Sequence, residues 1–197
     1  MMRKNQLLST AEAQYKDRGS KFLAFALPIA SEAEVSIHLH ALKSAHHAAR
    51  HWCYAWRLGE QAELYRSNDD GEPSGSAGRP ILAAIDQHQL TNCLVVVVRY
   101  FGGTLLGVRG LIDAYGGAAR MALELANISF LPIIRSLKLT CAYQQIAEVQ
   151  KVMNELNLKP ITQNYSNTNV EFRFEADEEV ISEASTRFLN IYGLVIQ

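Results

Sequence analysis

The sequence is poor in three features that define whole classes of protein: long apolar runs, cysteine, and charge of one sign. The longest apolar run, Cys93 to Val98, is far shorter than a membrane-spanning helix. Met1 to Lys4 leads into polar residues rather than the apolar stretch of a secretory signal. The three cysteines are widely separated, so we expect reduced thiols rather than disulfides. We therefore expect a cytoplasmic location and no membrane partner.

The net charge of −1 provides no overall attraction for nucleic acid, and the sequence carries no signal specific for DNA. The charge is nevertheless uneven along the chain. Residues 1–135 contain 14 Lys and Arg against 12 Asp and Glu, whereas residues 136–197 contain 5 against 8. Any anion-binding role therefore belongs to the first segment and requires a local cluster of basic residues.

The composition, 48% hydrophobic and 20% charged over 197 residues, is that of an ordinary globular protein. No internal repeat or low-complexity tract occurs, so compact domains are expected. Pro132 interrupts the helical spacing that precedes it and marks the expected domain boundary. We predict an α+β protein with domains at 1–131 and 132–197, and the sequence carries no signal for its oligomeric state.

The first domain combines apolar strands with amphipathic helices. Strands are expected at Lys21–Ile29, His51–Leu58 and Leu94–Tyr100. Because its apolar run is continuous, the last of these strands should be buried on both faces. Helices are expected to begin near Ser31, Pro80 and Val108. Residues 59–80, which are dense in Gly, Pro, Ser and Asp, are expected to form an irregular and functional loop.

The second domain has a clear order of elements. The predicted strands are Ile133–Ala142, Ile161–Tyr165, Val170–Phe174 and Ile191–Ile196. Helical stripes run from Ile146 to Leu156 and from Val180 to Phe188. The resulting order, β-α-β-β-α-β, is the ferredoxin-like arrangement, a fold that by itself indicates no function.

A Gly- and Arg-rich segment, Arg99–Gly110, is the leading candidate for an anion- or nucleic-acid-binding site. Its glycines allow close approach of a partner, and the helix that follows offers free N–H groups. Arginines supply bidentate donors for phosphate, and aromatic rings can stack on bases. The segment lacks a P-loop Lys and a Rossmann fingerprint, so no nucleotide cofactor is expected. The predicted binding residues are Arg79, Arg99, Tyr100, Phe101, Gly102, Gly103, Gly107 and Arg109.

Other residues allow alternative chemistry. Asp69, Asp70 and Glu72 offer oxygen ligands for a cation, acid–base partners for His51, or simply turn-forming side chains. His51 and Cys53 would share one face of a strand, but no further zinc-ligand pattern accompanies them, so no metal is expected. Gly116 and Gly117, inside a helical stripe, indicate close packing or contact with a ligand.

Four stretches, taken in order, closely resemble the IMPACT family, also called the YigZ family. They are His51–Arg57, Asp69–Pro80, Val97–Gly107 and Ala114–Ala118, and matching residues run from about Lys21 to Ala126. The resemblance implies a first domain folded like domain IV of elongation factor G. It implies a second, ferredoxin-like domain similar to domain V of that factor, as found in bacterial members.

The resemblance also implies a role in translation, because eukaryotic relatives regulate initiation through protein–protein contacts. For bacterial members, binding to RNA or the ribosome is the expectation, and no cofactor or catalytic mechanism is implied. Two positions depart from the family pattern. The position of Arg109 commonly holds a small residue, and the position of Asp113 commonly holds a basic one. Since positions four apart share a helix face, the positive charge has either moved along that face or been lost.

The leading hypothesis is a non-enzymatic binding protein for RNA, the ribosome or a translation-related protein, acting as a regulator of translation. A second hypothesis is a small-molecule hydrolase that uses Asp69, Asp70 or Glu72 with His51. A third is a protein-interaction module that uses the acidic second domain.

Overall fold

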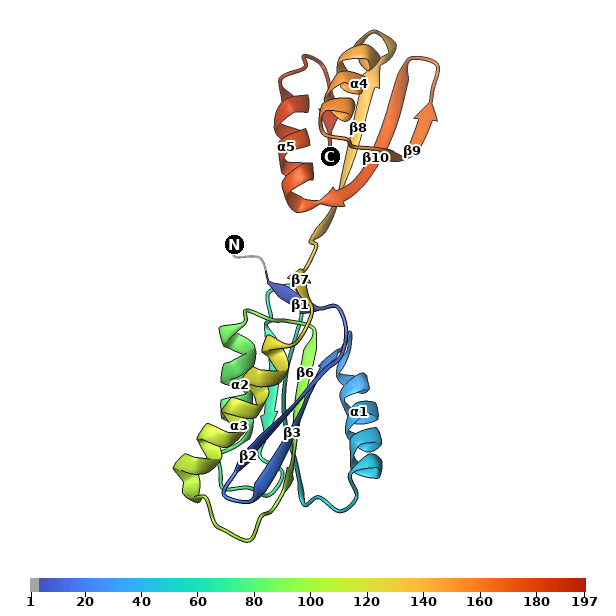
Figure 1. Cartoon of the computed structure of the whole chain (residues 1–197). Coiled ribbons are helices and arrows are strands. Elements are labelled where there is room, and N and C mark those ends of the chain that lie inside the picture. Colours follow the sequence, from blue (N-terminus) through green and yellow to red (C-terminus); the bar gives the residue numbers. More distant parts are fainter. Residues whose placement is uncertain (1–3) are drawn as a thin grey trace. The chain divides into compact units, whose positions relative to one another are not determined.

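The computed structural model describes residues 4–197, and the chain divides into two compact units, 1–131 and 132–197 (Figure 1). Each unit has its own antiparallel sheet and its own hydrophobic core, which confirms the predicted α+β class. Within the described part of the chain, no helix is long and apolar enough to cross a membrane.

The main sheet of unit 1 has five antiparallel strands in the order β2-β3-β6-β4-β5. These strands are β2 (Ala11–Asp17), β3 (Ser20–Pro28), β4 (His51–Leu58), β5 (Leu64–Asn68) and β6 (Cys93–Tyr100). The central strand β6 is buried along nearly its whole length, as its continuous apolar run predicts. Two further short strands, β1 (Asn5–Leu7) and β7 (Ile128–Phe130), pair with each other.

Helices cover both faces of this sheet (Figure 1). One face packs against α2 (Gly78–Gln87) and α3 (Gly107–Glu124), and the other packs against α1 (Glu32–Ala45). Because side chains alternate along a strand, Val95 and Val97 of β6 enter the core under α2 and α3. Val96 and Val98 enter the core on the α1 side.

Local sequence explains two details of unit 1. Gly116 and Gly117 are closely packed, which was one of the two explanations that their position predicted. A Cβ on Gly117 would lie 3.4 Å from the Tyr15 ring, and a Cβ on Gly116 would lie 3.5 Å from Pro80. The expectation of an irregular segment at 59–80 is partly wrong, because it contains β5 and the first residues of α2. β5 is an edge strand with polar, exposed residues, so it lacks an apolar pattern.

Unit 2 has the predicted order β-α-β-β-α-β and the sheet order β11-β8-β10-β9. Its elements are β8 (Ile134–Ala142), a short helix η1 (Tyr143–Gln145), α4 (Ile146–Glu155), β9 (Pro160–Tyr165), β10 (Asn169–Asp177), α5 (Glu178–Leu189) and β11 (Val195–Ile196). The apolar faces of α4 and α5 share one core with Phe172 and Phe174. The last strand is shorter than predicted, because Gly193 turns the chain with a φ of +83°.

The strand register brings four connections of unit 1 to one end of its sheet. Lys21 pairs with Tyr100, His51 with Arg99, and Tyr54 with Asn68. The turn 17–20, the loop 46–50, the loop 69–77 and the loop 101–106 therefore lie together, at the lower end of unit 1 in Figure 1. We call these four connections the loop end.

Candidate binding site

A cavity of about 430 Å³ opens at the loop end, and we call it the Glu72 pocket. Its polar lining consists of Arg50, His51, Glu72 and Arg99. Its apolar lining consists of Pro73, Phe101, Leu105, Leu106, Val108 and Leu111. A few polar groups among mostly apolar walls is the usual composition of a site for a small or flat ligand. A larger cavity of about 620 Å³ lies between α1 and β2–β3, but it lacks a buried charged pair.

A buried ion pair forms the floor of the Glu72 pocket. Arg99 Nη1 lies 2.6 Å from Glu72 Oε1, and the two side chains are only 6% and 5% exposed. The Tyr115 hydroxyl donates a second hydrogen bond to the same oxygen, at 2.8 Å. Burial raises the pKa of Tyr115, and the neighbouring Cys53 and Glu72 raise it further, so the hydroxyl keeps its proton. Glu72 is thereby held as an acceptor in a fixed position.

The Arg99 guanidinium lies between two aromatic rings, about equally distant from the centroids of Phe22 and Phe101 at 5.5 Å each. Its Nε atom is buried and has no hydrogen-bond partner among the described residues. A buried donor without an acceptor is destabilising and uncommon in folded proteins. The floor of the pocket thus has a surplus of donors on the arginine side.

His51, at the start of β4, forms one wall of the pocket. Its Nδ1 lies 2.8 Å from the carbonyl oxygen of Asp70. Since a carbonyl oxygen only accepts, Nδ1 carries a proton, and Nε2 of the neutral ring is an acceptor. Nε2 lies 4.0 Å from Glu72 Oε1, beyond hydrogen-bonding distance.

The two aspartates of the acidic loop stabilise the loop itself. Asp69 accepts hydrogen bonds from the N–H groups of Gly75, Ala77 and Gly78, at 2.8, 3.0 and 2.8 Å. Burial raises the pKa of the Asp69 carboxyl, but these N–H groups and Arg79 outweigh it, so the pKa lies below its ordinary value. The turn interpretation therefore describes Asp69, which also caps the start of α2.

The Asp70 carboxylate also bonds to the protein itself and does not line the pocket. Its Oδ2 accepts the N–H of Trp52 at 2.7 Å, and its Oδ1 lies 3.9 Å from Lys43 Nζ. Of the three acidic side chains, Glu72 has the only carboxylate described within 4.0 Å of a His51 ring nitrogen in residues 4–197. The described residues also contain no group of three His, Cys, Asp or Glu arranged to hold a metal ion. Cys53 is buried and donates to the Asp69 carbonyl at 3.0 Å, and burial raises the pKa of its thiol.

The structure brings together part of the predicted site. Arg99, Phe101 and Gly107 line the Glu72 pocket with His51 and Glu72. Arg79 and Arg109 are exposed at the starts of α2 and α3, outside the described lining of the pocket.

The predicted binding set, three arginines with Tyr100 or Phe101 as the stacking ring, is divided by the structure and stays a prediction. Arg99 is already neutralised by Glu72, and Tyr100 lies on the opposite face of the sheet. The Tyr100 hydroxyl is 3.0 Å from His46 Nδ1, on the α1 side. The physical reason is the alternation of β6, which turns adjacent residues to opposite faces.

Gly102 and Gly103 shape the loop that follows β6. A Cβ on Gly102 would collide with the backbone of Gly19 in the β2–β3 turn, and the Gly102 N–H donates to Ser20 Oγ at 3.2 Å. Gly103 has a φ of +88°, which favours glycine. At Gly102 the close approach is thus made by the protein's own hairpin, which positions Phe101, whereas a Cβ on Gly103 would meet nothing within 4 Å.

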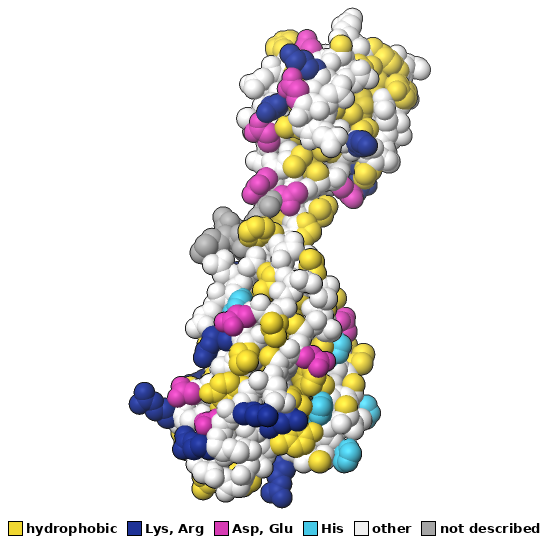
Figure 2. Space-filling model, viewed as in Figure 1, with side chains coloured by type: hydrophobic (Ala, Val, Ile, Leu, Met, Phe, Trp, Pro, Cys, Tyr) yellow, Lys and Arg dark blue, Asp and Glu magenta, His cyan; other side chains and the backbone are white. Residues whose placement is uncertain are grey.

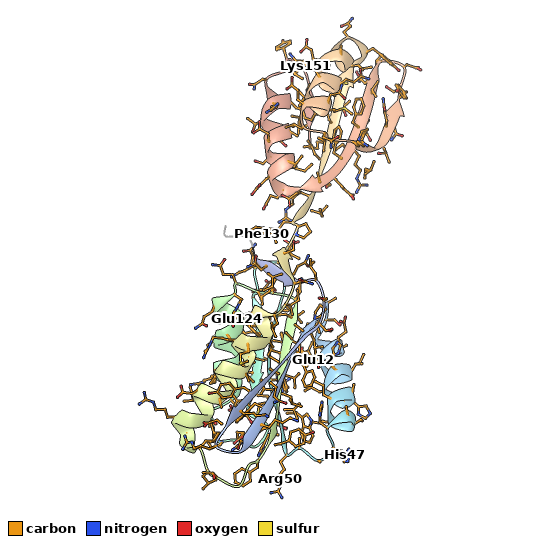
Figure 3. All side chains as sticks on the ribbon, viewed as in Figure 1. Glu12, His47, Arg50, Glu124, Phe130 and Lys151 are labelled. Atoms are coloured by element: carbon orange, nitrogen blue, oxygen red, sulfur yellow. The ribbon has the colours of Figure 1, made fainter. Side chains whose placement is uncertain are left out.

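The sequence analysis missed two residues of the site. Tyr115 occurs there only inside the stretch Ala114–Ala118, and nothing in the pattern distinguishes its hydroxyl from a surface one. Arg50 stands alone among apolar and histidine residues, so no cluster indicated it. Figure 3 places Arg50 at the loop end with its side chain directed away from the sheet. The sequence offered one signal for Arg50: it is a basic residue directly before β4, the strand that begins with His51.

Comparison with known proteins identifies the relatives of this chain. A model of the Impact N-terminal domain matches residues 18–123, more than half of the sequence. The chain belongs to the IMPACT family. It is 32% identical to IMPACT family member YvyE of Bacillus subtilis, covering 87% of this chain and 80% of that protein. It is 36% identical to an IMPACT family member of Haemophilus influenzae, covering 74% and 71% respectively.

Two further similarities agree with this assignment. IMPACT family member YigZ of Escherichia coli is 35% identical, over 64% of this chain and 62% of that protein. A crystal structure of a hypothetical protein matches with a TM-score of 0.65 and 25% identity, covering 100% of this chain and 97% of that chain. The resemblance found in the sequence is thereby confirmed. All residues lining the Glu72 pocket, 50 to 111, fall inside the segment matched by the family model.

Proposed function

We propose that this IMPACT family member regulates translation by binding RNA through the loop end of unit 1. The family resemblance supports the link to translation. The observation that supports RNA as the ligand is a set of exposed arginines at the loop end, one of which, Arg50, lines a mostly apolar pocket. Phosphate attracts the arginines, and an apolar pocket beside them suits the face of a base.

The arginines at the loop end are available for phosphate. Arg50, Arg79 and Arg109 are exposed, and the structure describes no ion pair for them within residues 4–197. Arg18 reaches over the same region, where its guanidinium lies 3.5 Å from the Leu106 carbonyl oxygen. Figure 2 shows Lys and Arg side chains gathered at this end of unit 1. Exposed guanidinium groups bind phosphate without the desolvation that a buried group requires.

The first turn of α3 adds a second anion-attracting feature. The helix begins at Gly107, beside the pocket, with no side-chain hydrogen bond at its N-cap and no acidic residue in its first turn. Its N-terminal N–H groups therefore point toward the loop end without a partner side chain, where the helix dipole favours negative charge. Arg109 lies in the same turn, so dipole and side chain attract the same phosphate.

Charge reversal tests this proposal. We expect the double variant Arg50→Glu/Arg109→Glu to bind fluorescein-labelled single-stranded RNA at least about tenfold more weakly at low salt. Its affinity should also depend less on salt, by about 0.7 in the log–log slope for each phosphate contact removed. Fluorescence anisotropy across a salt series measures both quantities.

The matched control is Lys151→Glu, the same type of change at an exposed position of α4 in unit 2 (Figure 3). It should leave RNA affinity within about twofold of the unsubstituted protein. Absence of RNA binding at low salt, with retained binding to a translation factor, would contradict the proposal and favour a protein partner.

One observation favours a second candidate function, a small-molecule hydrolase. His51 and Glu72 both line the pocket and face each other at 4.0 Å, as that hypothesis requires. However, Glu72 already accepts hydrogen bonds from Arg99 and Tyr115, so it is a fixed acceptor rather than a mobile acid–base group. Turnover in a screen of ester and phosphoester substrates, abolished by Glu72→Gln, would establish the hydrolase.

A further inference from the structure

We propose that the Glu72 pocket holds one unstacked, amino-bearing base of the bound RNA, and that Glu72 and His51 accept the two hydrogens of its exocyclic amine. The inference rests on the proposed function and specifies which part of the RNA enters the pocket. Adenine and cytosine satisfy this chemistry, whereas uracil does not.

Two hydrogen-bond acceptors, His51 Nε2 and the Glu72 carboxylate, face each other in the pocket. His51 Nδ1 donates to the Asp70 carbonyl, which leaves Nε2 as an acceptor when the ring is neutral. The Glu72 carboxylate is also an acceptor: its Oε1, 4.0 Å from Nε2, already accepts from Arg99 and Tyr115, so its spare capacity lies on Oε2. An –NH₂ group has two hydrogens and can satisfy both acceptors at once. A carbonyl oxygen at the same point, such as O4 of uracil, would face two acceptors.

The Arg99 guanidinium, also in the floor of the pocket, has an unused hydrogen-bond donor. Arg99 donates to Glu72 through Nη1, but its buried Nε has no acceptor among residues 4–197. The guanidinium therefore has more donors than the protein supplies with acceptors. In adenine and cytosine a ring nitrogen acceptor lies directly beside the exocyclic amine. One planar ligand thus presents a donor to Glu72 and His51 and an acceptor toward the arginine.

The shape and polarity of the walls also support the proposal. Phe101 is 49% exposed, Val108 54% and Leu105 82%, so a patch of apolar surface surrounds the polar floor. A flat ring placed on Phe101 would cover part of this surface by stacking. Arg50 lines the same pocket and is directed outward, where the phosphate attached to an inserted base would lie.

The test uses the full-length protein and fluorescein-labelled decamers in anisotropy measurements at constant salt. A decamer of uridines with one central adenosine is compared with all-uridine, and with one that carries purine riboside, which lacks the 6-amino group, at the centre. We expect the single adenosine to increase affinity about tenfold or more over both, because without the amine neither Glu72 nor His51 receives a hydrogen bond from the base.

Glu72→Gln tests the acceptor directly. The substitution keeps the shape and an oxygen for Arg99, but it replaces the carboxylate with an amide. We expect the preference for adenosine over purine riboside to fall to about twofold or less. His51→Leu, at a less buried position, should remove the same preference if Glu72→Gln does not fold. The matched control is Glu124→Gln, at the far end of α3 (Figure 3), which should retain the full preference.

The outcomes separate this inference from the proposed function. Equal affinity for adenosine, purine riboside and uridine decamers, with salt-dependent binding intact, overturns the base pocket and leaves RNA binding in place. Retained preference in both Glu72→Gln and His51→Leu overturns it as well. Failure to bind any RNA at low salt removes the proposed function and this inference together.

Discussion

Unit 1 and unit 2 are both built from antiparallel sheets and helices, yet they treat polar groups differently. Among the described residues, the buried polar and charged side chains, Ser20, Ser76, Thr91 and Arg99, all lie in unit 1. In unit 2 the charged pairs, such as Lys138–Glu171 and Arg173–Glu175, are exposed on the sheet face opposite α4 and α5. In unit 1 three of the four, Ser20, Ser76 and Arg99, lie at the loop end, whereas Thr91 bonds the Gly59 carbonyl at the other end of the sheet.

The two units should differ most in the free energy of unfolding that is lost when one partner of an ion pair is removed. Glu72→Ala leaves Arg99 buried and unpaired, which should lower the free energy of unfolding by about 3–5 kcal/mol. Glu171→Ala breaks the exposed pair with Lys138, and should lower it by about 1 kcal/mol or less. Urea unfolding of the two variants measures the contrast. Similar small losses in both would show that the buried pair is not a structural element of the site.

The carboxylates that cap helices in the two units should differ less. Asp69→Ala removes three N–H contacts and should lower the free energy of unfolding by about 2 kcal/mol. Asp177→Ala removes the side-chain cap on the Glu179 N–H, and should lower it by about 1 kcal/mol. Urea unfolding at pH 7 compares the two losses.

The Asp69 effect should depend on pH in a defined direction. Because the folded-state pKa of Asp69 is below its ordinary value of 3.8, its stabilisation is complete above that pH. The stabilisation is lost as the pH falls through the folded-state pKa. The stability gap between the unsubstituted protein and Asp69→Ala should therefore be smaller at pH 2.5 than at pH 7, and a gap that grew on acidification would contradict this role.

The smallest expected contrast is between two tyrosine hydroxyls. Tyr115→Phe removes a buried donor to Glu72, and should lower the free energy of unfolding by about 1–2 kcal/mol. Tyr143→Phe in unit 2 removes an exposed hydrogen bond to the Ser166 carbonyl, and should change it by about 0.5 kcal/mol or less. Thermal unfolding monitored by circular dichroism resolves the order of the two variants.

The fold could be predicted largely from periodicity, because most elements bury one clear apolar stripe. The helices of unit 2 and the continuous run of β6 are examples. β2 and β5 were missed because they are edge strands: polar, exposed positions interrupt Ala11–Asp17, and Leu64–Asn68 has little buried surface. An edge strand is specified by its neighbour as much as by its own residues.

The site could be predicted in part, because its glycines, Arg99, Phe101, His51 and Glu72 stand in unusual local patterns. The sequence does not reveal that Glu72 neutralises Arg99, or that Tyr115 donates to the same carboxylate, since the three residues come from distant segments. The opposite orientations of Arg99 and Tyr100 did follow from strand alternation, and that signal was available in the sequence. The roles of Asp69 and Asp70 depend on backbone N–H groups, whose directions no residue pattern records.

The central claim is that RNA is bound at the loop end of unit 1. Ultraviolet cross-linking of the full-length protein to single-stranded RNA, followed by mass spectrometry of the nucleotide-bearing peptides, tests it most directly. We expect cross-links in peptides that contain Phe101 or His51, and their loss in Arg50→Glu/Arg109→Glu. Cross-links concentrated in residues 132–197, and unaffected by those substitutions, would contradict the claim.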